Sequence, residues 1–120
     1  MEMKGQGFTR RLGFALQGLK RATGSERSLR THLGAAAGVL LVLLLTQPAP
    51  LWWAVLGLAV GIVLMAELFN SALETLIDHV HPEHHPEVGA AKDIAAAAVL
   101  LASIAAVVAG LAFAVDCLSG

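Results

Sequence analysis

The sequence predicts an all-α membrane protein, in which an N-terminal amphipathic surface helix is followed by three transmembrane helices. Of the 120 residues, 57% are hydrophobic and only 14% are charged, and the mean hydropathy is +0.72. The apolar residues gather in three blocks, over residues 33–46, 51–66 and 94–115. A helical span of a bilayer needs about 20 apolar residues. Three spans leave little chain for another unit, so residues 1–120 are expected to form a single membrane domain.

The basic residues are distributed unevenly along the chain. Seven of the eight precede the first apolar block, and the eighth, Lys92, lies between the second and third blocks. The loop over residues 47–50 carries no charge, and the tail after Val115 carries only Asp116. Because positively charged loops stay in the cytoplasm, this distribution predicts a cytoplasmic N-terminus and an outer C-terminus. The seven N-terminal basic residues are Lys4, Arg10, Arg11, Lys20, Arg21, Arg27 and Arg30.

Residues 8–22 are predicted to form an amphipathic helix that lies on the cytoplasmic leaflet, because apolar and basic side chains occupy opposite sides. The alternative is a solvated leader that only sets the topology. The segment Thr23-Gly24-Ser25 is predicted to break this helix, and Ser25 or Ser28 to cap the next one. The apolar side comprises Phe8, Leu12, Ala15, Leu16 and Leu19.

The three spans are predicted over residues 28–46, 51–80 and 90–115. The first two apolar blocks are short, but helices that start near Ser28 and run past Phe69 reach the required length, with Arg30 extending to the interface. Residues 81–86 contain two prolines and are predicted to form a tight cytoplasmic turn. Trp52 and Trp53 are expected at the outer interface. Cys117 is the sole cysteine, so no intramolecular disulfide forms.

Five polar residues at the end of the second apolar block share one helix face, within an arc of roughly 100°. The preceding residues 51–66 carry no charge. Carboxylates where a span meets water are costly, which favours a functional site. Acids with an amide between them are suited to a hard cation and a polyphosphate. The five residues are Glu67, Asn70, Ser71, Glu74 and Asp78.

Acidic and basic residues at one membrane face together indicate phosphoryl transfer. Glu26, Glu83 and Asp93 lie at the same predicted face as the five polar residues. Neither a P-loop nor a protein-kinase motif is present. Glu67 lies deeper than Glu74, roughly 10 Å along the helix axis, where desolvation favours a role as proton acceptor. Glu74 is nearer to water and suits a magnesium ligand. The alternative for Glu67 is a carboxyl satisfied by neighbouring Asn or Ser side chains.

Two other hypotheses come from the same residues. His79, His81, His84 and His85 are potential zinc or nickel ligands. However, no cysteine and no paired helical H-x-x-x-H spacing supports such a site, and a proline-bounded turn favours polar residues in any case. His32 is expected to be an interfacial helix residue. A non-enzymatic membrane subunit, or a conduit for metal ions lined by the acids, is the alternative to an enzyme.

The polar segments resemble the bacterial integral-membrane diacylglycerol kinase family, which includes undecaprenol kinases. The resemblance begins with an E-x-x-N-[ST]-A-x-E series over residues 67–74, followed by Asp78. It continues with Pro82-Glu83-His84-His85 and Ala91-Lys92-Asp93, and covers almost the whole chain. Upstream, Gly7-Phe8-Thr9-Arg10, Gly18, Glu26-Arg27 and Arg30 also fit.

The resemblance implies a homotrimer in the bacterial inner membrane, with active sites at subunit boundaries facing the cytoplasm. It implies transfer of the γ-phosphate of magnesium ATP to a lipid alcohol, with no nucleic-acid partner. Glu67 is then the general base, and Glu26 and Glu74 hold Mg²⁺ and the nucleotide. Further nucleotide contacts are implied for Glu83, His85, Lys92 and Asp93. Supporting or substrate-binding roles are implied for Arg10, Phe14, Arg30, Asn70, Ser71 and Asp78.

Two residues depart from the family pattern, and two segments bear on the lipid acceptor. Phe14 replaces a Tyr found in some members near the nucleotide, and His84 replaces the usual aromatic. Residues 26–32 resemble the E-R-N-F-R-x-H segment of the undecaprenol kinases, whereas the N-terminal G-F-T-R resembles the diacylglycerol enzymes. The longer match favours undecaprenol, with diacylglycerol, giving phosphatidic acid, as the alternative.

Overall fold

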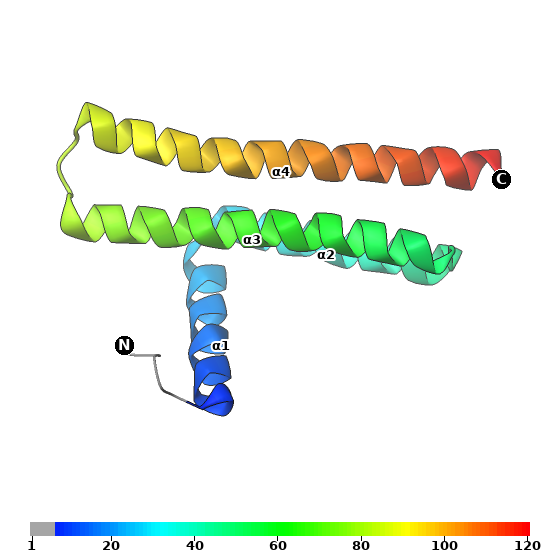
Figure 1. Ribbon diagram of the computed structural model, residues 1–120, viewed down its shortest axis with the longest axis horizontal. Helices are drawn as coiled ribbons and strands as arrows, with labels where there is room; N and C mark the ends of the chain where they lie inside the picture. The colour runs from blue at the N-terminus through cyan, green and yellow to red at the C-terminus, as the bar shows by residue number, and fades with distance from the viewer. Residues whose placement is uncertain (1–6) are drawn as a thin grey trace.

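The structure, a computed structural model, describes residues 7–120, and these form four α-helices with no strand. The helices are α1 (Phe8–Ser25), α2 (Arg27–Thr46), α3 (Pro50–Val80) and α4 (Pro86–Ser119). α2, α3 and α4 run side by side, and α1 crosses their direction (Figure 1). α3 packs against both α2 and α4. The all-α prediction is confirmed for these residues, while Lys4 lies outside them.

Within residues 7–120, three helices are long and apolar enough to cross a membrane, namely α2, α3 and α4. α2 has 20 residues, which makes it about 30 Å long and matches the hydrocarbon thickness of a bilayer. α3 has 31 residues and α4 has 34, so both are longer than a span requires. Their surplus turns continue past the start of α2 on the side of the α3–α4 turn (Figure 1). These surplus turns carry Glu74, Asp78 and Lys92, whereas Glu67 lies at the level of Ser28, near the start of α2.

The junction of α1 and α2 differs from the prediction. The helix does not break at residues 23–25 but continues to Ser25, and the break falls on Glu26, whose backbone is extended at φ −109° and ψ 109°. The hydroxyls of Thr23 and Ser25 donate to the carbonyls of Leu19 and Arg21, at 2.8 and 3.0 Å. These bonds within the helix satisfy both side chains without ending it. Neither Ser25 nor Ser28 caps α2, whose N-cap is Glu26 with no side-chain hydrogen bond.

Arg30 joins the two helices at this junction. Its Nη1 donates to the carbonyl oxygens of Thr23 and Gly24, at 2.9 and 3.1 Å. These carbonyls belong to the last turn of α1, where no further turn of the helix supplies N–H groups to donate to them. A cation at a helix C-terminus also complements the helix dipole. Arg30 therefore fixes the direction of α1 relative to α2.

The apolar core lies at the opposite end of the bundle. Leu43, Leu56 and Phe113 from the three long helices are buried against one another. The ring of Trp52 meets Phe113 edge to face at 5.4 Å between centroids, and its Nε1 donates to Asp116 at 2.9 Å. This contact joins the start of α3 to the end of α4. α4 begins at Pro86 and ends at Ser119, beyond the predicted 90–115 at both ends.

Candidate active site

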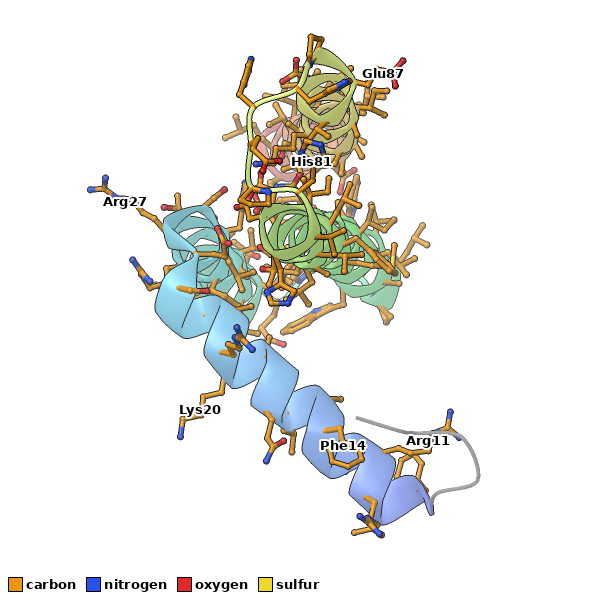
Figure 2. All side chains as sticks on the ribbon, turned by 90° about the vertical axis from the view of Figure 1, so that its left-hand side faces the viewer. Arg11, Phe14, Lys20, Arg27, His81 and Glu87 are labelled. Carbon is orange, nitrogen blue, oxygen red and sulfur yellow. The ribbon has the colours of Figure 1, made fainter. Side chains whose placement is uncertain are left out.

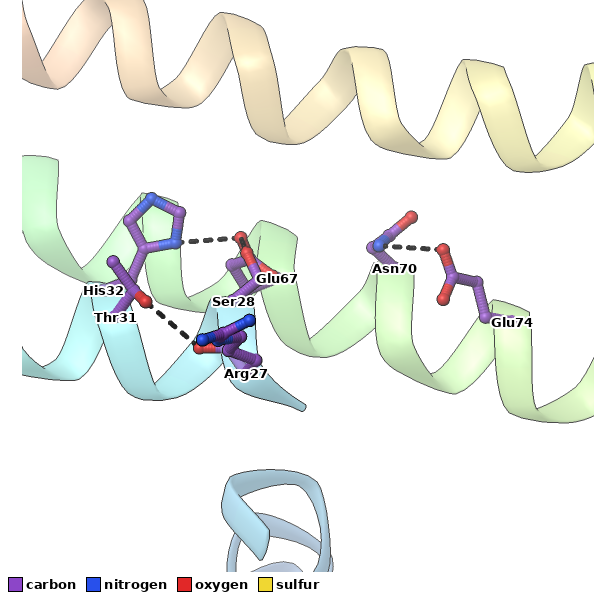
Figure 3. A network of polar contacts seen from close by, with 7 residues as sticks. All are labelled: Arg27, Ser28, Thr31, His32, Glu67, Asn70 and Glu74. Atoms are coloured by element: carbon purple, nitrogen blue, oxygen red, sulfur yellow. Dashed lines mark hydrogen bonds and ion pairs between the residues drawn. The ribbon is translucent and has the colours of Figure 1, made fainter. Parts of the chain in front are cut away.

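Glu67 is a buried carboxylate between α2 and α3, with only 2% of its surface exposed. Ser28 on α2 donates from Oγ to Oε1 of Glu67 at 2.6 Å. Nδ1 of His32 lies 2.8 Å from the same oxygen (Figure 3). That separation is short enough for an ion pair, but the approach lies outside hydrogen-bond directions, so Nδ1 has no hydrogen-bond partner within residues 7–120. A charge in this position is held by two side chains of the neighbouring helix.

Asn70 and Glu74 form a second group one turn further along α3. Nδ2 of Asn70 donates to Oε1 of Glu74 at 3.4 Å, and both side chains extend from α3 toward α4 (Figure 3). This is a long and therefore weak bond. Oδ1 of Asn70 is buried and takes no hydrogen bond from the part of the chain that the structure describes. The pair thus presents carboxylate and amide oxygens between α3 and α4.

Asp78 and Lys92 connect the surplus turns of the two long helices. Nζ of Lys92, near the start of α4, donates to Oδ1 of Asp78 on the last turns of α3. The carboxylate of Asp78 is exposed, and the ammonium of Lys92 is about a third exposed. The ion pair therefore orients Lys92 toward α3, on the same helix face as Glu74.

The turn between α3 and α4 holds its histidines by local contacts. Nδ1 of His85 accepts from the backbone N–H of Glu87 at 3.1 Å, which makes His85 the N-cap of α4. Nδ1 of His81 lies 3.0 Å from the carbonyl oxygen of Glu83, and the two imidazole rings meet edge to face at 5.7 Å. In residues 7–120, no three His, Cys, Asp or Glu side chains gather where they would hold a metal. Glu83, His84 and Asp93 are exposed.

Glu26 and Ser71 line an open pocket of about 610 Å³ between α1 and α3. Ser71 is buried, with 6% exposed, and Glu26 is half-buried at the α1–α2 junction. Glu26 thus lies on the α1 side of the polar face of α3, whereas Glu74 faces α4. The remaining lining is mainly apolar, from Ala15, Gly18, Leu19, Leu68, Ala72 and Leu76.

The outer part of α1 projects away from the three long helices. Phe14 lies on this projecting part (Figure 2), and Arg10 is one turn nearer the start of the helix. Phe14 is half-buried and Arg10 is exposed. Within one chain, the structure does not place these two residues beside Glu67, and Arg30 is engaged with the end of α1.

Comparison with known proteins decides the family. A family model of prokaryotic diacylglycerol kinase matches residues 13–114. The chain belongs to this family. It is 33% identical over 95 residues to an undecaprenol kinase of Bacillus subtilis, covering 79% of this chain and 77% of the relative. It is 32% identical over 105 residues to a diacylglycerol kinase of Escherichia coli, covering 85% and 86%. With a diacylglycerol kinase of Synechocystis it shares 38% over 98 residues, covering 81% of this chain and 56% of the relative.

As a member of the prokaryotic diacylglycerol kinase family, the protein is a lipid kinase, and kinases of this kind transfer phosphate from ATP. The alternative of a non-enzymatic subunit or ion conduit is therefore wrong. The three apolar helices together with the bacterial family indicate an inner-membrane protein.

The pairing of Ser28 and His32 with Glu67 differs from the sequence-based prediction. That prediction makes Ser28 a candidate helix cap and His32 a helix residue at the membrane interface. A signal was present, since the two polar residues lie four apart and therefore share one face of α2. The alternative that a serine satisfies Glu67 agrees with the contact from Ser28, but the hydrogen bond does not exclude a chemical role for the carboxylate.

Proposed function

We propose that this lipid kinase transfers the γ-phosphate of ATP to the hydroxyl of a membrane lipid alcohol, with Glu67 as the proton acceptor. The observation that carries the proposal is the burial of this carboxylate between two membrane helices. Burying a charge is costly unless it is paired and hydrogen-bonded, and an ionisable residue in a span indicates a function. Ser28 supplies a hydrogen bond to this carboxylate, and Nδ1 of His32 lies 2.8 Å from the same oxygen.

The proposed step uses groups of the substrates and Glu67 alone. The lipid oxygen attacks the γ-phosphorus while its proton passes to the Glu67 carboxylate. The bond from the γ-phosphorus to the bridging oxygen breaks, and ADP leaves with that electron pair. A positioned base of this kind contributes about 10²–10⁴-fold to the rate.

Glu26 and Glu74 are the proposed holders of Mg²⁺, and the donor chemistry fits this ion. Magnesium is usually bound by one or two carboxylates together with substrate phosphates. Glu74 is half-buried, and the neighbouring Oδ1 of Asn70 is buried without a partner in residues 7–120, so hard oxygen atoms are available there. When bound, the ion would neutralise charge that develops on the phosphate oxygens.

The nucleotide is proposed to lie at the surplus turns of α3 and α4. Glu83, His85, Lys92 and Asp93 belong to the turn and the start of α4, at the same end as Glu74. Lys92 is oriented by Asp78 and would exchange this partner for a phosphate oxygen. Ser71 and Arg30 would support the junction of α1, α2 and α3. By the distribution of basic residues, this end faces the cytoplasm and the C-terminus lies outside.

A homotrimer with sites shared between subunits is proposed for three reasons. Glu26 and Glu74 lie on different sides of the polar face of α3 in one chain, as described above. In addition, α1 projects away from its own bundle (Figure 2), so Arg10 and Phe14 would reach a neighbouring copy more readily than their own Glu67. Three helices also offer little volume to enclose both a nucleotide and a lipid.

Undecaprenol is the proposed acceptor, with diacylglycerol as the alternative. The match of residues 26–32 supports undecaprenol. A mainly apolar crevice of about 130 Å³ beside His32 adds support, because it lies deeper in the span and is lined by small and aliphatic residues. Its lining includes Ala35 and Ala36 of α2, Val60 and Leu64 of α3, and Ser103 and Ala106 of α4.

An acceptor assay tests the proposed function. Purified protein in bilayers, given γ-labelled ATP and Mg²⁺, should label undecaprenol with a higher kcat/KM than diacylglycerol at equal surface concentration. A preference for diacylglycerol would contradict the acceptor while leaving the chemistry intact. No labelled lipid with either acceptor would contradict the proposed reaction.

A further inference from the structure

We infer that Ser28 and His32 are positioning residues, which hold Oε1 of Glu67 so that Oε2 is directed at the lipid hydroxyl. This inference rests on the proposed role of Glu67 as proton acceptor. It assigns to α2 a part in the chemistry that neither the family match nor the relatives' names specify. Neither residue is required to exchange a proton.

The geometry distinguishes the two oxygens of the carboxylate. Both α2 side chains approach Oε1, Ser28 at 2.6 Å and His32 at 2.8 Å. Within residues 7–120, Oε2 takes no hydrogen bond from a side chain. A hydrogen bond from a hydroxyl to a carboxylate at this distance is of the strong, charge-assisted kind. Since the carboxyl group is planar, fixing one oxygen also fixes the direction of the other.

The positioning residues are themselves held in place. Leu29, which follows Ser28 in α2, is fully buried, with 0% of its surface exposed. Arg30 fastens the start of α2 to the carbonyls of α1. Side chains four residues apart lie over one another on a helix, so Ser28 and His32 are presented to Glu67 from a single rigid surface.

His32 also connects the carboxylate with the apolar crevice. Its ring lines that crevice together with Ala35 and Ala36, while its Nδ1 faces Glu67. The Nδ1 atom is buried without a hydrogen-bond partner in the described residues, and an unsatisfied buried group is unfavourable. A small rotation of the ring would turn the 2.8 Å contact into a hydrogen bond. A lipid alcohol in the crevice would therefore pack against the group that orients the base.

Kinetics of four variants in bilayers test the inference. Ser28→Ala should lower kcat by about tenfold or more, because its hydrogen bond to the Glu67 carboxylate is lost. His32→Ala should also lower kcat, because the 2.8 Å contact of Nδ1 with the same oxygen is removed. The KM for magnesium ATP should stay unchanged, because neither residue is proposed to touch the nucleotide. His32→Asn keeps an N–H donor near the position of Nδ1 and should recover part of the kcat. Thr31→Ala is the matched control, because this hydroxyl donates only to the Arg27 carbonyl of its own helix.

A second readout does not depend on turnover. The infrared difference between wild type and Glu67→Gln isolates the Glu67 carboxylate band, and Ser28→Ala should shift this band whereas Thr31→Ala should not. The inference would be overturned if Ser28→Ala and His32→Ala lowered kcat no more than Thr31→Ala does, or if Ser28→Ala left the Glu67 band unshifted. If Ser28→Ala shifts the band but the wild-type protein labels no lipid, the proposed function is contradicted while the Ser28–Glu67 contact stands.

Discussion

Oγ of Ser28 donates to Oε1 of Glu67 at 2.6 Å, although the two residues are 39 positions apart in the chain. The contact joins α3 to the beginning of α2. From this level, α3 and α4 continue beyond α2 toward the turn that connects them (Figure 1). The buried carboxylate, the Asn70–Glu74 pair and the Asp78–Lys92 ion pair then follow one another along α3 toward the turn. This order places the proposed proton acceptor deepest and the proposed nucleotide contacts nearest to water.

Glu74→Gln should raise the apparent KM for magnesium ATP by about tenfold or more, because a charged oxygen ligand becomes a neutral amide. Excess Mg²⁺ should restore part of the activity. The measurement is a series of initial rates over a magnesium titration. Glu87→Gln, at an exposed position of α4 outside the proposed site, is the matched control. Equal magnesium curves for both variants would remove Glu74 from the metal site.

Mixing inactive Glu26→Gln and Glu67→Gln proteins should restore activity if the two residues serve one site from different subunits. With random assortment in a closed trimer, about a quarter of the boundaries contain both native residues. The experiment co-reconstitutes the two variants after exchange of subunits in detergent and compares them with each variant alone. Mixed trimers without recovered activity would indicate a site contained in one chain.

Ala35→Leu should lower kcat/KM for undecaprenol by about tenfold, because the added methyl groups fill the crevice beside His32. Activity toward diacylglycerol should fall less. Ala37→Leu, at an exposed position of α2 outside the crevice, is the control, and thermal unfolding checks that over-packing has not destabilised the fold. Equal losses with both acceptors would show that the crevice does not select the lipid.

Trp52→Phe should destabilise the protein by about 1 kcal/mol, since the ring contact with Phe113 remains but the hydrogen bond to Asp116 is lost. Unfolding curves in detergent measure this change. Trp53→Phe is the matched control, because the hydrogen bond to Asp116 comes from Trp52 and not from Trp53. A variant of Trp52 as stable as that of Trp53 would show that the Asp116 contact contributes nothing.

The sequence predicted the helices well wherever a local signal ends them. α3 was expected over residues 51–80 and occupies Pro50–Val80, because prolines and an uncharged loop bound it. The α1–α2 junction was predicted wrongly, since Thr23 and Ser25 bond back into their helix and Glu26 carries the break. Residues typical of a cap are equally able to bond within a helix, and the sequence alone does not distinguish the two.

Helical periodicity predicts which polar residues neighbour one another along α3, but not which helix each of them meets. Glu67 contacts Ser28 of α2, whereas Asp78 contacts Lys92 of α4. The pairing of Ser28 and His32 with Glu67 depends on how α2 is rotated against α3, and packing rather than periodicity sets that rotation. Similarly, the N-cap role of His85 depends on the backbone of the turn.

The proposed reaction depends most directly on Glu67, so the decisive measurement compares Glu67→Gln with wild type in the same bilayers. The substitution keeps the size of the side chain and its contact with Ser28 but removes the proton acceptor. We predict that kcat for lipid phosphorylation falls by about 10²–10⁴-fold while the affinity for magnesium ATP, measured by equilibrium binding, stays the same. A variant with near wild-type kcat, or one whose only defect is nucleotide binding, would contradict the assignment of Glu67 as the base.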